Sequence, residues 1–359
     1  MGLFQHLFGS GSQGSTELPH TPESASPRIG SKPISPQRPM GFANRNENEP
    51  DSGLSRPLLE LLSKFLHGAS PNGFSQPYWD KALGGPATNA ASHLVAINLL
   101  APATSEAKLA ATCAVAELKA LARGLGLKVS GTKAELANRL VNEDAAGMDA
   151  RMAAVPMLEC TEKGRKAAEE YVANEKVAHD VAVADSLAYI KSGQYRLASR
   201  TMSTYEAGRV IPRGIGIDWN HADTTRDERI LNRIFVSHPG ILADVLPDDL
   251  APLRIGAAMM HLWGTNRVQP WLPPEFMASG HLDSDVAARM ILFEALNHTE
   301  CDGWKVAGIK RVTVLGSGDS CPTCKSLAGK SFAIDRAPQL PHEHCSSDSG
   351  CRCCLVADV

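Results

Sequence analysis

The sequence has 359 residues, of which 43% are hydrophobic, and a formal net charge of -3 at pH 7. This length exceeds what one hydrophobic core usually organises, so we expect several domains. A slightly acidic chain has no global attraction to nucleic acid or to anionic lipid, so any such binding must be local. Residues 1–8 lack the basic segment and apolar run of a secretory signal, and no run of eighteen apolar residues follows. We therefore expect no membrane span and a cytoplasmic location.

The N-terminal segment is rich in Pro, Gly and Ser and poor in large apolar side chains. Such a composition buries too little surface to offset chain entropy, which predicts a disordered leader over residues 1–57. Leu and Phe residues at helical spacing then predict a short helix from Pro57 that ends at Gly68. A second helix is predicted over 88–100, and 58–105 is interpreted as a helical segment and linker.

The segment 112–140 has the pattern of two short helices joined by a tight turn. Thr112 is a plausible N-cap for the first helix, which Gly124 and Gly126 should end. Ser130 or Thr132 can then cap the second helix. The predicted buried faces are Val115, Leu118, Leu121 and Ala122 in the first helix, and Leu136, Ala137 and Leu140 in the second.

This segment is basic although the chain is acidic. It carries five basic and two acidic side chains, a local net charge of +3. The turn at 130–133 places backbone N–H groups at a helix N-terminus beside Lys133, an arrangement that can bind a phosphate. The same charges can instead form a solvated helix face, or bind RNA or a protein. The candidate nucleic-acid-binding residues are Lys119, Arg123, Lys128, Ser130, Gly131, Thr132, Lys133 and Arg139.

The residues at 115–119, 126–127, 130–136 and 139–140 closely resemble a SAP module, a helix-extended-helix unit of many chromatin and DNA-repair proteins. We assign the SAP-like module to residues 106–145. The resemblance implies weak DNA binding with little sequence specificity, often with a preference for AT-rich DNA. It implies contacts through the residues that match the family at Lys119, Lys128, Gly131, Thr132 and Lys133.

The middle of the chain, residues 150–300, is predicted to be a helical domain. The turn at 160–166 resembles the strand-to-helix turn of winged-helix domains, but the preceding recognition-helix pattern is missing, and a helical hairpin is the alternative. This domain can bind a protein partner, although its sequence indicates no specific function. Apolar spacing predicts helices at 163–189, 194–209, 227–236, 247–261 and 283–298.

The last segment, 310–359, concentrates cysteine: six of the nine cysteines follow residue 320. A β-prone run at 312–315 precedes Cys-Pro-Thr-Cys at 321–324, which predicts a small α/β module holding zinc. Zinc takes four thiolate or imidazole ligands, two of which a C-x2-C turn supplies. A thioredoxin-like redox site and free thiols are the alternatives. The predicted ligands are Cys321, Cys324, Cys345 and Cys351, with Cys353, His342 and His344 as substitutes.

The segments 321–332, 337–342 and 350–353 also resemble the C-terminal end of phage head-morphogenesis proteins of the Mu F-like type. The residues 345–350 depart from that family as an insertion before the closing Cys-Arg-Cys. The resemblance implies a structural protein of phage or mobile-element heads, in a bacterial or phage-infected cell.

Together these patterns predict a mainly α, multi-domain protein. The predicted function is non-catalytic DNA binding through the SAP-like module, with a structural zinc site at the C-terminus. A head-morphogenesis protein is one alternative, and a metal-dependent nuclease or toxin using His342 and His344 is another. The sequence lacks the G-x-S-x-G, P-loop and G-x-G-x-x-G motifs, so nothing in it indicates catalysis, and the question of an enzyme is left open.

Overall fold

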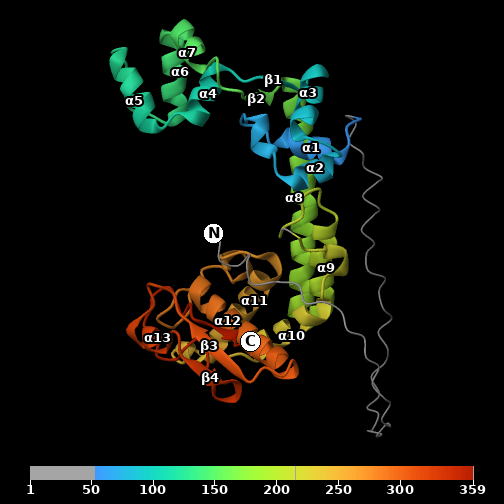
Figure 1. Ribbon diagram of the computed structural model, residues 1–359, viewed down its shortest axis with the longest axis vertical. Helices are drawn as coiled ribbons and strands as arrows, with labels where there is room; N and C mark the ends of the chain where they lie inside the picture. Colours follow the sequence, from blue (N-terminus) through green and yellow to red (C-terminus); the bar gives the residue numbers. More distant parts are fainter. Residues whose placement is uncertain (1–52, 215, 359) are drawn as a thin grey trace. The chain divides into compact units, whose positions relative to one another are not determined.

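The computed structural model describes residues 53–214 and 216–358, which contain thirteen α-helices and two small β-sheets. The chain divides into two compact units, one up to Ala168 and one from Glu169 onward, with the boundary inside one long helix, α8 (Figure 1). The leader predicted at 1–57 lies almost entirely outside the described residues. Within residues 53–214 and 216–358, none of the helices combines the length and the apolar character needed to cross a bilayer.

The first unit contains seven complete helices, two short strands and the start of α8. Its elements are α1 (Arg56–Ser63), α2 (Pro77–Leu83), α3 (Ala87–Ala96), β1 (Leu100–Pro102), α4 (Ser105–Thr112), α5 (Val115–Gly124), α6 (Lys133–Glu143), α7 (Ala145–Met152), β2 (Leu158–Cys160) and α8 (Glu162–Lys191), with a 3-10 turn at Pro71–Phe74.

Strand β1 precedes helices α4 to α7 in the chain, β2 follows them, and the two strands form an antiparallel pair. Strand β1 pairs with β2 so that Leu100 lies opposite Cys160 and Pro102 opposite Leu158. The four helices between the strands pack around their own buried cluster, formed by Leu109, Cys113, Leu118, Ala122, Leu136, Ala137, Leu140, Met148 and Met152. The helix pair α5–α6 is therefore the centre of a four-helix subdomain that the chain enters through β1 and leaves through β2.

Four predictions for this unit are wrong. The helix predicted from Pro57 to Gly68 ends at Ser63, and residues 64–67 form turns. Val115, predicted to be buried, is the first residue of α5 and is 43% exposed. The helix predicted over 88–100 ends at Ala96, because Asn98 adopts a left-handed φ of 58° and Leu100 begins strand β1. Thr112 is not the N-cap of α5. It is the last residue of α4, where its hydroxyl donates to the Lys108 carbonyl at 2.7 Å, and Ala114 occupies the N-cap position of α5.

The second unit consists of helices that pack beside a three-stranded sheet. Its elements after α8 are α9 (Tyr195–Ala207), α10 (Thr224–Val236), α11 (Pro247–Trp263), α12 (Ser284–Val306), β3 (Arg311–Leu315), α13 (Pro322–Leu327), β4 (Ser331–Ala333) and β5 (Cys354–Ala357), with 3-10 turns at Trp219–His221, Gly240–Leu242, Gln269–Trp271 and Ile334–Arg336. The helices predicted in this region are present, and α12 continues eight residues beyond the predicted end at His298.

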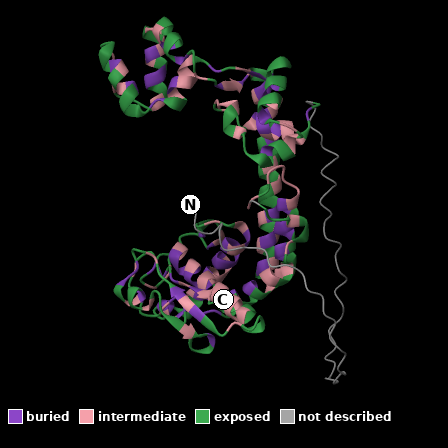
Figure 2. Ribbon diagram, viewed as in Figure 1, coloured by how far each residue is buried: buried purple, intermediate pink, exposed green. Residues whose placement is uncertain are grey.

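The sheet has the order β4-β3-β5 and is antiparallel throughout. The buried residues Val312 and Val314 of β3 belong to the same hydrophobic cluster as the buried faces of α10, α11 and α12. Five buried cysteines of the C-terminal segment also belong to this cluster. The burial colouring of Figure 2 shows buried positions in both the helices and the C-terminal segment. The helices and the cysteine-bearing segment thus share one core.

Candidate nucleic-acid interface and cysteine centre

The turn between α5 and α6 is built by hydrogen bonds from both helices. Helix α5 ends where Leu127 N–H donates to the Ala122 carbonyl at 2.8 Å, a reversal that uses the positive φ of Gly126. Leu118 and Ala122 of α5 are buried beside Leu136 and other residues of α6. This packing holds the ends of the exposed turn at 128–132 in place.

A capping box begins α6. Thr132 N–H donates to the Glu135 carboxylate at 2.7 Å, and Glu135 N–H donates to the Thr132 hydroxyl at 3.3 Å. These bonds satisfy two of the groups that a helix N-terminus leaves open, and the amides of Lys133 and Ala134 have no intrahelical acceptor by helix geometry. The Thr132 hydrogen bonds lower the pKa of Glu135, so its carboxylate is charged at neutral pH.

Glu135 therefore has a role at this site that the list of candidate residues missed. The Thr-Lys-Ala-Glu sequence at 132–135 is the capping-box signature that could have revealed it. Gly131 has φ 121°, and a Cβ there would lie 2.5 Å from the Glu135 Oε2 atom. The backbone conformation and the space beside the capping box both require glycine at this position.

Arg139 points back to the turn. Its guanidinium donates to the Lys128 carbonyl and, at 3.3 Å, to the Ser130 carbonyl. Arg139 thus fixes the shape of the turn and has fewer N–H groups left for a ligand. Lys133 is the first residue of α6, and its Nζ atom donates to the Ala111 carbonyl of α4 at 3.5 Å.

The remaining cations face solvent. Arg123 and Lys128 are exposed, and Lys119 and Lys133 are partly exposed. Among the described residues, no carboxylate lies within salt-bridge distance of any of these four cations, whereas neighbouring Glu117 is paired with Arg151 at 2.7 Å. Unpaired cations beside a helix N-terminus can bind phosphate oxygens through charge-assisted hydrogen bonds.

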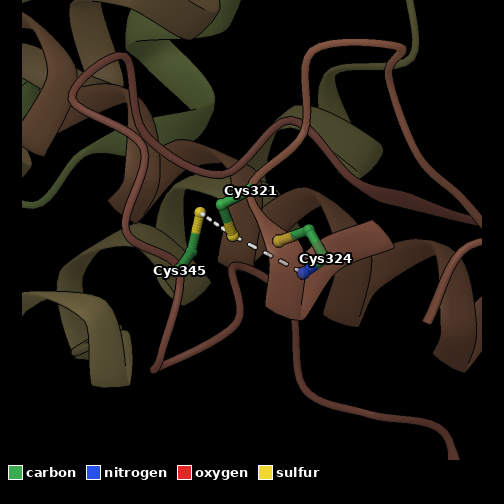
Figure 3. Close-up of side chains that lie close together, drawn as sticks. All are labelled: Cys321, Cys324 and Cys345. Atoms are coloured by element: carbon green, nitrogen blue, oxygen red, sulfur yellow. Dashed lines mark hydrogen bonds between the residues drawn. The ribbon is translucent and has the colours of Figure 1, made fainter. Parts of the chain in front are cut away.

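The second site is a cluster of buried thiols in the other unit, which we call the cysteine centre: Cys321, Cys324, Cys345, Cys351 and Cys353. Cys321 is the N-cap of α13, and its sulfur accepts a hydrogen bond from Cys324 N–H at 3.5 Å. Figure 3 shows that the side chains of Cys321 and Cys324, at the start of α13, and of Cys345, in the loop before β5, point toward one another.

Two groups of three thiols share Cys324. The sulfurs of Cys321, Cys324 and Cys345 lie within 4.8 Å of one another, and so do those of Cys324, Cys351 and Cys353. Of the ligands predicted from sequence, the four preferred cysteines and Cys353 are all brought together. His342 and His344 belong to neither group. His344 N–H donates to His342 Nδ1 at 3.1 Å, and His344 Nε2 lies 3.6 Å from the Glu343 carboxylate.

The thiols differ in how readily they ionise. Burial opposes ionisation of Cys321, but hydrogen bonds from the amides of Cys324 and Ser346 outweigh it and lower its pKa to about 6. Burial raises the pKa of Cys345 to about 11, and burial together with the neighbouring Cys351 raises the pKa of Cys324 and Cys353. Several thiols thus cannot ionise together near neutral pH without a cation to compensate their charge.

The donor set fits a soft metal ion. A tetrahedral zinc with Zn–S bonds of about 2.3 Å places its sulfurs about 3.8 Å apart. The Cys321–Cys345 and Cys324–Cys351 sulfur pairs are each 3.8 Å apart. The cluster can hold a metal ion, and its all-sulfur composition favours zinc or another soft ion.

Comparison with known proteins gives one family match. The family model of the SAP domain matches residues 114–145, which include all of α5 and α6. No curated protein and no solved structure matches the chain. The helix pair, its capping box and its exposed cations therefore lie within a segment of known type: residues 114–145 are a SAP domain.

Proposed function

We propose that the protein binds the sugar-phosphate backbone of duplex DNA through its SAP domain, weakly and with little sequence specificity. The observation that carries this proposal is a set of four cations without an ion-pair partner: Lys119 and Arg123 on α5, Lys128 in the turn and Lys133 at the start of α6. Lys128, Lys133 and the turn at 130–132 contact phosphates, and Arg139 acts by holding the turn. If three to five phosphates are neutralised, log K falls with log salt at a slope of about -3 to -4.5.

The test is a charge reversal with a matched control. Lys128→Glu with Lys133→Glu should weaken binding of full-length protein to a short duplex by about tenfold or more, and should reduce the salt slope by about two. Lys163→Glu with Lys166→Glu makes the same change of net charge on exposed positions of α8. Fluorescence anisotropy measures both. Equal affinity of the two double variants would refute the assignment, provided that circular dichroism shows both to be folded.

We further propose that the cysteine centre binds one zinc ion and that the ion stabilises the second unit. The support is the burial of Cys324 with four other thiols, among which two sulfur pairs have the 3.8 Å spacing of a tetrathiolate site. Metal analysis of the purified protein should find about one equivalent of zinc. Cys324→Ser should remove it, whereas Cys301→Ser, at a half-buried cysteine of α12 outside the centre, should retain it. A metal-free wild type would end this proposal.

Two sequence-based alternatives stay as hypotheses. The Mu F-like resemblance suggests a structural role in phage heads, in which the SAP domain would tether a genome end, and co-purification with a capsid or portal protein would support it. The nuclease hypothesis needs His342 and His344 beside a metal, but both lie outside the thiol groups, and the His344 side chain is 75% exposed. The division into segments 1–57, 58–105, 106–145, 150–300 and 310–359, and the cytoplasmic location, are likewise proposals.

A further inference from the structure

The cysteine centre contains one thiol more than a tetrahedral ion accepts. Cys321, Cys345, Cys324 and Cys351 form two sulfur pairs, each with a spacing of 3.8 Å. Both lengths match the edge of a tetrathiolate site. Cys321, Cys324 and Cys345 form one compact group and supply three ligands. The fourth ligand must come from Cys351 or Cys353, which are both buried and both grouped with Cys324.

The two candidates for the fourth position lie on the same side of the centre. Cys351 and Cys353 lie within 4.8 Å of each other and of Cys324, and neither belongs to the group that contains Cys321 and Cys345. Among the described cysteines, Cys113, Cys160, Cys301 and Cys354 belong to neither group. Two donors are therefore available for one corner of the site.

The backbone that carries both thiols is held in place. Cys351 N–H donates to the Met290 sulfur of α12 at 3.2 Å, and the side chain of Arg352 pairs with Asp319. On the far side, Cys354 begins strand β5, which pairs with β3. Contacts at Cys351, Arg352 and Cys354 thus hold the segment 351–353 on both sides, and both of its thiols stay beside Cys324.

We propose that Cys353 is a reserve ligand, which exchanges with Cys351 at one corner of the metal site while Cys321, Cys324 and Cys345 remain bound. This inference rests on the metal centre proposed above. In the exchange, the Cys353 thiol gives up a proton as it binds and the released Cys351 thiolate takes one up. The ion keeps four thiolates, and the charge of the centre is unchanged.

The exchange makes the two sides of the centre chemically different. Loss of the Cys351 thiol can be compensated by Cys353, whereas loss of the Cys345 thiol leaves three thiolates and an opening for water. An incoming thiol or chelator can also bind the ion at the position that Cys351 and Cys353 share, while the other three thiolates remain bound. The centre is therefore built to accept soft, thiolate-preferring ions such as Zn²⁺ or Cd²⁺ and to release them through one corner.

The test uses full-length protein loaded with Co²⁺, whose sulfur-to-metal absorption reports the number of bound thiolates. Cys351→Ser and Cys353→Ser should each bind one equivalent with wild-type absorption. Cys345→Ser and the double Cys351→Ser, Cys353→Ser variant should lose about a quarter of the absorption and about tenfold or more in affinity against a chelator. Cys354→Ser, next to the centre but outside both groups, is the control and should match wild type.

A second measurement needs no variant, and it keeps the inference testable if a variant fails to fold. Slow alkylation of zinc-loaded wild type, followed by mass spectrometry, should label Cys351 and Cys353 at similar rates, and both faster than Cys321, Cys324 and Cys345. Complete protection of Cys351 with labelling of Cys353 alone would overturn the exchange.

The outcomes separate the two proposals. If Cys351→Ser loses affinity as Cys345→Ser does, the reserve ligand is refuted and the metal centre stands. Two bound equivalents in wild type would also overturn the reserve role, because Cys324 would then bridge two ions. A wild type that binds no metal refutes the centre and the exchange together.

Discussion

Glu135→Gln should strengthen DNA binding, although the residue contacts no DNA in the proposed mode. Its carboxylate lies at the N-terminus of α6, where it accepts the Thr132 N–H, and the same hydrogen bond keeps its pKa low. Glutamine preserves the acceptor and the shape of the capping box, since Glu and Gln both serve at this position. The substitution therefore removes one negative charge beside the proposed phosphate site and leaves the turn intact.

The size of the effect follows from the distance. A unit charge about 5 to 8 Å from a phosphate in water changes the binding constant by about two- to fourfold. Glu143→Gln is the matched control, because Glu143 is an exposed residue at the other end of the same helix. Eight residues of helix separate the two sites by about 12 Å, which exceeds the Debye length of about 10 Å at 0.1 M salt.

The assay is fluorescence anisotropy with a labelled duplex at about 0.1 M salt, followed by a series at higher salt in which the gain should shrink. Circular dichroism of both variants checks that α6 is preserved. Unchanged or weaker binding by a folded Glu135→Gln protein would refute the placement of the phosphate at this helix N-terminus. An equal gain in DNA affinity from Glu143→Gln would mean that the change in net charge, and not the position of Glu135, causes the effect.

Two further predictions concern stability. Thr132→Ala should destabilise the helix pair by about 0.5 to 2 kcal/mol, whereas Thr112→Ala, which caps no helix, should change the free energy of unfolding by less than about 0.5 kcal/mol; urea unfolding compares them. Asp227→Asn should cost about 1 to 3 kcal/mol at pH 7, because the partly buried Asp227 contacts His261 Nε2 at 3.0 Å and accepts the Ser199 hydroxyl at 2.5 Å. Burial raises the pKa of Asp227, but these partners outweigh it and hold the pKa below that of an ordinary Asp. The stabilisation is thus present above the ordinary Asp pKa and is lost as the pH falls through the lower folded pKa. The gap between variant and wild type should therefore close in acid, and a gap that stays constant to pH 2 would contradict this.

The helix pair could be predicted because its signals are local. Apolar spacing indicates the buried face of α6 correctly and that of α5 at Leu118 and Ala122, although Val115 is exposed. Thr132 and Gly126 mark where the second helix begins and the first ends. The misplaced cap at Thr112 shows the limit of the same reasoning. Thr112 looks like a start signal before 115–124, but α4 extends up to it, and its hydroxyl is already used within that helix. A residue type that favours caps therefore indicates a helix boundary, but it does not show whether a helix begins or ends there.

Long-range pairing could not be predicted in this way. Strands β1 and β2 are three residues each, and nearly sixty residues separate their partners, so neither has a periodic pattern of its own. The predicted metal ligands were found only in part. Clustering of cysteines in the sequence indicated the centre, but only the fold shows that Cys353 lies beside Cys324 and Cys351 and that His342 and His344 belong to neither thiol group.

The two proposed sites depend on different cores, and this determines how their mutations combine. The SAP domain packs around the cluster that includes Leu118 and Leu136, while the cysteine centre belongs to the cluster of α10, α11 and α12. The two clusters have no residue in common. Changes at sites that share no partners have additive free energies, whereas changes among neighbours do not. Substitutions at Glu135 and Cys351 should therefore act independently, but those at Cys351 and Cys353 cannot, because each of these thiols changes what the loss of the other costs.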